Sequence, residues 1–174
     1  MGDNSWWVGV LTALTAIGAS WVTSRGNTSS ARIEAEVNAH ASHVAKVRDE
    51  RRRAYSEMSA SAHALAEVFW RMVEVDRSVD NSRKAEIINE MQIASRKALG
   101  GVTKASTEVY LQGPEPVAKE ARALQQAAVA SFWKLGEIGD ARGDQRNQYT
   151  LAYQAFRAQH HRFIDVARAG LEVT

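Results

Sequence analysis

The chain of 174 residues contains no cysteine and only two prolines. Without cysteine, no disulfide framework, thiolate metal site or cysteine nucleophile is possible. The two prolines, Pro114 and Pro116, lie close together, so long stretches on either side lack the residue that most strongly interrupts helices. No run alternates apolar and polar residues in the manner of a half-buried strand. These absences predict an all-α fold.

Charge of one sign is also lacking, because 22 Lys and Arg residues face 20 Asp and Glu residues. The densest basic cluster, 51–53, is interleaved with Asp49, Glu50 and Glu57. This mixture is typical of ion pairing along an oligomeric helix, and we expect no nucleic acid partner. No phosphate-binding glycine loop and no nucleophile motif is present. We therefore expect no catalytic residue, no cofactor and no enzymatic activity.

One long stretch, residues 5–24, carries no charge and has Trp6, Trp7 and Trp21 near its ends. As a helix these 20 residues would extend about 30 Å, the thickness of the hydrocarbon core of a bilayer. Tryptophan is enriched at membrane interfaces. We predict a transmembrane helix at 5–24, with Trp6, Trp7, Trp21 and Arg25 at the interfaces. A helix buried in a protein core is the alternative, since Thr, Ser and Gly dilute the apolar content.

Small residues follow one face of this predicted span. Gly9, Ala13, Ala16 and Ser20 succeed one another at steps of 4, 3 and 4 residues, which is the spacing of a single helical face. Because small side chains let helices approach closely in lipid, we expect these four residues to mediate self-association of the span.

The flanking charges predict the orientation of the span. Residues 1–4, a short outside tail, carry only Asp3, whereas Arg25 and Arg32 follow the span. Positive charge favours the cytoplasmic side. We expect a single-pass membrane protein with its N-terminus outside and the remaining chain in the cytoplasm.

After a polar linker at 25–30, residues 31–53 predict a helical stalk. The stalk is very polar apart from one narrow seam with the alternating steps of 4 and 3 that are typical of a coiled coil. A polar residue in such a seam weakens it but fixes its register. The residues expected to pair with other copies of the chain are Ile33, Val37, His40, Val44, Val47 and Arg51.

From residue 54 onward the apolar face widens, which favours a globular bundle. Residues 76–82 are rich in turn and cap residues, and the sequence Gly-Pro-Glu-Pro at 113–116 predicts the start of another helix. Gly100 and Gly101 leave open whether the helix before them stops or continues. Four helices with short connections predict an antiparallel four-helix bundle over 54–174.

The histidines are the remaining candidates for chemistry. Glu36, His40 and His43 share one helical face, but three ligands at this spacing fall short of the four that structural zinc sites use, so we predict no metal site. For His160 and His161 we expect a solvated helix face with one half-buried histidine.

Three features together resemble the small, uncharacterised membrane-anchored helical proteins found in actinobacteria. They are the Trp-flanked N-terminal span, the sequence Arg-Arg-Arg-Ala-Tyr at 51–55 and the sequence Leu-Gln-Gly-Pro at 111–114. The resemblance implies a membrane anchor and a helical fold, and it implies no activity.

Three hypotheses for function follow. The first is a membrane-anchored, self-associating helical scaffold whose bundle binds a cytoplasmic protein partner. The second is an oligomeric membrane effector whose spans form a pore or disrupt the bilayer. The third is a soluble helical assembly that buries residues 6–22 in its own core.

Overall fold

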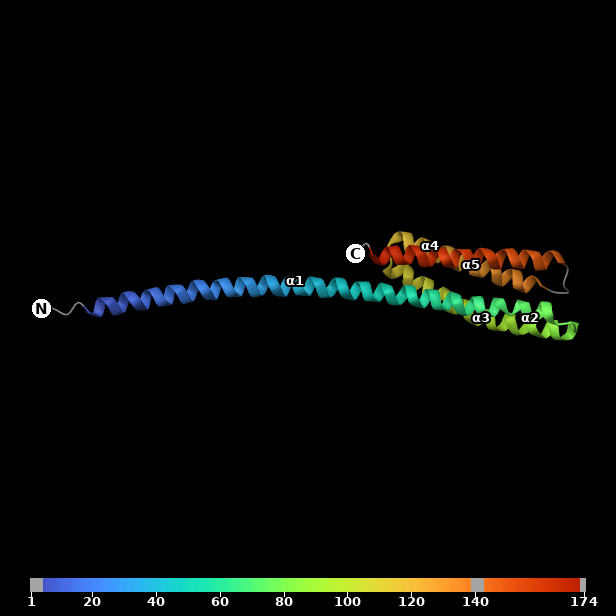
Figure 1. The fold of residues 1–174 in the computed structure, drawn as a ribbon, viewed down its shortest axis with the longest axis horizontal. Helices are drawn as coiled ribbons and strands as arrows, with labels where there is room; N and C mark the ends of the chain where they lie inside the picture. The colour runs from blue at the N-terminus through green and yellow to red at the C-terminus, as the bar shows by residue number, and fades with distance from the viewer. Residues whose placement is uncertain (1–4, 139–142, 173–174) are drawn as a thin grey trace. The chain divides into compact units, whose positions relative to one another are not determined.

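The computed structural model describes the backbone of residues 5–138 and 143–172, and the side chains of residues 34–138 and 144–172. Every element in this part of the chain is a helix (Figure 1), which confirms the all-α prediction. The elements are α1 (Ser5–Trp70), α2 (Met72–Arg77), α3 (Asn81–Gln112), α4 (Glu115–Glu137) and α5 (Gly143–Glu172).

The chain divides into two compact units, residues 1–46 and 47–174. The predicted membrane-interface residues Trp6, Trp7, Trp21 and Arg25, and the small-residue face from Gly9 to Ser20, lie outside the residues whose side chains are described. The bounds of α1 run through 25–30, where the sequence predicts a linker. Among the helices with described side chains, none is both long and apolar enough to cross a bilayer.

Four long helical segments form a bundle in the second unit: the C-terminal part of α1, and α3, α4 and α5 (Figure 1). In each neighbouring pair of helices, residues later in one helix contact residues earlier in the other. Each pair is therefore antiparallel. Such contacts join Ser59 to His160 and Phe69 to Tyr149 (α1 and α5), Arg51 to Gln112 and Arg71, the residue after α1, to Glu90 (α1 and α3), Gln92 to Leu135 and Thr103 to Gln125 (α3 and α4), and Glu120 to Gln159 and Ser131 to Ala152 (α4 and α5). Each helix therefore borders two others around one core.

Phe69 lies in the middle of an aromatic cluster within that core. Its ring meets those of Tyr149, Tyr153 and Phe156 edge to face, at centroid distances of 6.1, 6.0 and 5.9 Å, the geometry that aromatic pairs prefer. Phe69 and Phe156 are fully buried. Met58 and Leu65 of α1 and Leu124 and Leu135 of α4 are fully buried as well.

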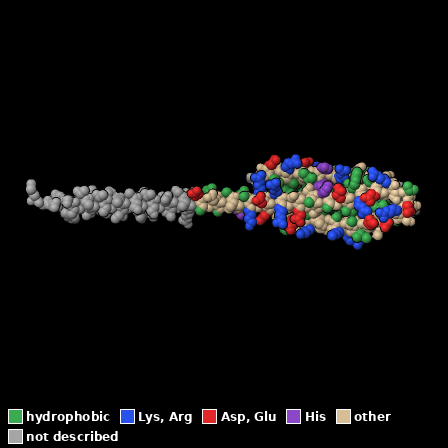
Figure 2. Space-filling model, turned by 60° about the horizontal axis from the view of Figure 1, so that its bottom comes forward, with side chains coloured by type: hydrophobic (Ala, Val, Ile, Leu, Met, Phe, Trp, Pro, Cys, Tyr) green, Lys and Arg blue, Asp and Glu red, His purple; other side chains and the backbone are tan. Residues whose placement is uncertain are grey.

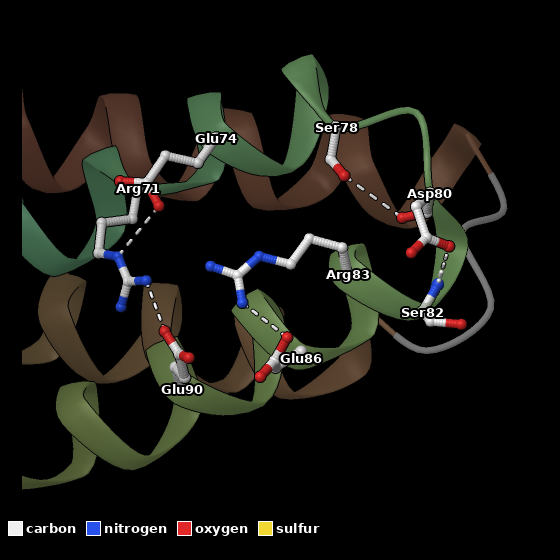
Figure 3. Close-up of polar contacts among 8 residues, drawn as sticks. All are labelled: Arg71, Glu74, Ser78, Asp80, Ser82, Arg83, Glu86 and Glu90. Carbon is white, nitrogen blue, oxygen red and sulfur yellow. Dashed lines mark hydrogen bonds and ion pairs between the residues drawn. The ribbon is translucent and has the colours of Figure 1, made fainter.

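The turn from α1 to α3 is held by polar contacts (Figure 3). Arg71, between α1 and α2, donates to Glu90 of α3 at 2.6 Å. Asp80 caps α3 by accepting a hydrogen bond from the backbone N–H of Ser82 at 3.0 Å, which satisfies one of the donors left free at a helix start. The non-helical residues of this connection are 78–80, which lie within the turn predicted at 76–82.

The glycines and prolines have different effects on the helices. α3 continues through Gly100 and Gly101 to Gln112, which settles the question left open by the sequence. Pro114 lies at the N-cap of α4, which begins at Glu115, as predicted from the sequence.

Candidate functional site: a groove between α1 and α5

A surface groove with a volume of about 810 Å³ lies between α1 and α5. It belongs wholly to the second unit. Figure 2 shows histidine side chains, in purple, at the surface of the bundle among charged residues. The residues that line the groove are Ser56, Ser59, Ala60, His63, Ala66, Glu67 and Trp70 from α1, and Tyr153, Arg157, His160, His161 and Ile164 from α5.

His160 is the most constrained side chain in the groove. A hydrogen bond of 3.1 Å joins its Nε2 to Oγ of Ser59 across the two helices. Its ring stacks on that of Phe156 at a centroid distance of 6.5 Å. Burial, and then the neighbouring His161 and His63, lower the pKa of His160, while hydrogen bonding to Ser59 raises it. His160 is therefore largely neutral at pH 7, and the prediction of one half-buried histidine is confirmed.

His63, Glu67 and Arg157 of the groove are exposed. His63 faces Glu67, with 3.8 Å between Nε2 and Oε1. Arg157 forms no ion pair with the described residues. Burial raises the pKa of Tyr153, and the charge of Arg157 partly offsets this by lowering it. Glu67 is the only carboxylate in the lining and Arg157 is its only arginine or lysine, so Arg157 is the one cationic side chain of the groove that has no ion-pair partner among the described residues.

Large apolar surface lies beside these charges. Trp70, the last residue of α1, is 55% exposed, although an indole of this size is usually mostly buried. Ala60 and Ala66 leave room between the helices because their side chains are small. A second, shallower groove along α1 shares Ser56 and Ala60 with the first, so the depression continues along that helix.

The residues predicted to mediate stalk self-association differ in how exposed their side chains are. Ile33 lies outside the residues whose side chains are described, and His40 is exposed. Val37 and Val44 are 61% and 39% exposed. Val47 is partly buried.

Arg51 has a partner within its own chain, which its heptad spacing does not predict. Its Nε donates to the backbone carbonyl of Gln112 at 2.9 Å. Gln112 is the last residue of α3, and a cation is favoured at a helix C-terminus. Arg51 is therefore engaged within its own bundle, whereas Val37 and Val44 are exposed.

No group of three or more potential metal ligands is found within the described residues. Glu36, His40 and His43 all lie exposed on α1.

Helical spacing does not predict the contact of Ser59 with His160 either, because 101 residues separate the two. Only the antiparallel pairing of α1 with α5 and its register bring them together. The sequence signal is limited to helical spacing: Ser59 lies three residues before the buried Ala62, and His160 lies four residues after the buried Phe156.

Comparisons with known proteins give no relative for this chain: no family model, no curated protein and no solved structure matches it.

Proposed function

We propose that this chain is a single-pass, membrane-anchored helical scaffold that self-associates through α1 and presents its bundle to protein partners in the cytoplasm. The uncharged, Trp-flanked stretch at 5–24 supports the anchor. Arg25 and Arg32 support the orientation.

The observation that carries the proposal is the exposed apolar seam of α1. Val37 and Val44 are separated by seven residues, so they lie on the same helical face two turns apart. Both are exposed within the single chain. A second copy of α1 aligned along this seam would cover both, and burying a valine side chain stabilises by about 1.5 kcal/mol.

The test uses the absence of cysteine from the natural chain. In Val44→Cys the only thiol lies in the seam, whereas in Ser42→Cys it lies about 200° further round the helix, at 100° per residue. Both positions are exposed. We expect oxidative crosslinking in native membranes to give covalent dimers of Val44→Cys and few of Ser42→Cys.

Two results would overturn the proposal. The first is equal crosslinking at the two positions, because it would mean random collision and not a seam. The second is recovery of the chain as a monomer in the soluble fraction after membrane fractionation, which would remove both the anchor and the self-association.

A further inference from the structure

The groove between α1 and α5 has the form of a helix-binding trough. Its lining residues recur at every turn of α1 from Ser56 to Trp70, and along α5 from Tyr153 to Ile164. At 1.5 Å per residue these stretches measure about 21 and about 16 Å, or three to four helical turns. Small residues on α1, such as Ser56 and Ala60, allow a third helix to approach closely.

The unpaired arginine of the groove favours an acidic group on its occupant. Arg157 has no ion-pair partner among the described residues, and His160 and His161 lie beside it on α5. The single carboxylate of the lining, on Glu67, already faces His63. A carboxylate on an incoming helix would therefore meet an available guanidinium.

Apolar anchors are available at both ends of the trough. Trp70 and Tyr153 lie toward the end where α1 stops, and Ile164 lies toward the other. Tryptophan and tyrosine are the residues that most often carry binding energy at interfaces. An amphipathic helix binds such a surface with apolar residues spaced at i, i+4 and i+7.

We infer that this groove is the docking site for an acidic amphipathic helix of a partner protein. The inference rests on the proposed scaffold function, because it names the surface and the kind of partner that the bundle would bind. The occupant is a helix with a leucine stripe and glutamates beside it, and the glutamates contact Arg157.

The test measures the binding of two synthetic peptides to the full chain in a zwitterionic detergent. Both carry a fluorescent label and the same leucine stripe, and they differ only in having glutamate or lysine beside it. We expect fluorescence anisotropy to show that the glutamate peptide binds at least about tenfold more tightly, since opposite charge at an interface selects partners. Equal affinity for the two peptides would overturn the inference.

A pair of charge reversals locates the site. Arg157→Glu changes the groove, whereas Arg162→Glu makes the same change at an exposed position of α5 outside the lining. We expect the first variant to weaken binding of the glutamate peptide about tenfold and the second less than about threefold. Equal weakening would mean general attraction to a basic surface and would refute a groove-specific site.

Crosslinking gives a second readout that does not depend on charge. A cysteine at the end of the glutamate peptide should form a disulfide with Ala60→Cys in the groove and not with Ile93→Cys, which is 66% exposed on α3. Equal reaction at both positions would contradict the proposed location. If peptide binding fails while Val44→Cys still crosslinks, the docking site is refuted and the self-association is not.

Discussion

The hydrogen bond between Tyr149 and the end of α1 gives the sharpest test of the packing. The Tyr149 hydroxyl donates to the carbonyl of Phe69 at 2.9 Å, and the contact is buried. α1 ends at Trp70, so the Phe69 carbonyl is among the last four of the helix, which lack an intrahelical partner. Tyr149→Phe keeps the ring and removes the only donor that the side chain provides.

The expected loss follows from leaving a buried carbonyl unpaired, which costs about 1–3 kcal/mol. For Tyr149→Phe we expect about 1.5 kcal/mol and a fall in Tm of about 5 °C, measured by circular dichroism on the full chain. Tyr153→Phe is the matched control, because its hydroxyl lies 3.5 Å from the Ala66 carbonyl, at the limit for a hydrogen bond. It should cost less than about 0.5 kcal/mol. Equal losses in the two variants would refute the argument.

The pH dependence of stability offers an independent check on the same residue. Burial raises the pKa of the Tyr149 phenol. Because the folded pKa lies above the unfolded value, the stability contribution of this group is fully present below the unfolded pKa, near pH 10, and declines as pH rises further. We expect the Tm of the natural chain to fall more steeply above about pH 10 than that of Tyr149→Phe. Parallel profiles would contradict a buried, protonated phenol.

Two further predictions concern other parts of the bundle. Gly100→Ala should stabilise the chain by about 0.5–1 kcal/mol, because an added Cβ meets nothing within 4 Å. Gly113→Ala should instead lower Tm, because its Cβ would lie 2.8 Å from the Val109 carbonyl oxygen. His160 has a lowered pKa in the folded chain, so its contribution is present above the unfolded pKa and is lost as pH falls below about 6.5. Thermal unfolding between pH 7 and 5 should show a smaller loss of stability for His160→Gln than for the exposed control His43→Gln; equal losses would contradict this assignment.

Much of the bundle could be predicted from the sequence because its core follows helical periodicity. Met58, Leu65 and Phe69 recur at steps of seven and four, and all three are buried. The predicted turns also match, since Asp80 and Pro114 each lie at a helix N-cap. Local chemistry and spacing were sufficient for these features.

Other features depend on which helices become neighbours, and local pattern does not contain that information. Ser131 is fully buried, although a serine gives no apolar signal, because its Oγ reaches the Ala127 carbonyl at 2.9 Å and the Ala152 carbonyl at 3.0 Å. Arg51 follows the heptad spacing, yet it binds the end of α3. The groove itself arises from the register of α1 against α5, which no single helix specifies.

The antiparallel pairing of α1 with α5 has a consequence for synthesis of the chain. Phe69 lies 80 residues before its partner Tyr149, so at 5–20 residues per second the ribosome completes Phe69 about 4–16 s earlier. During that interval α3 is the only one of the two long helices bordering α1 that can cover its apolar face. Closure of the bundle therefore waits for the last helix to be made, and a nascent chain that stops before α5 exposes an aromatic surface to chaperones and proteases.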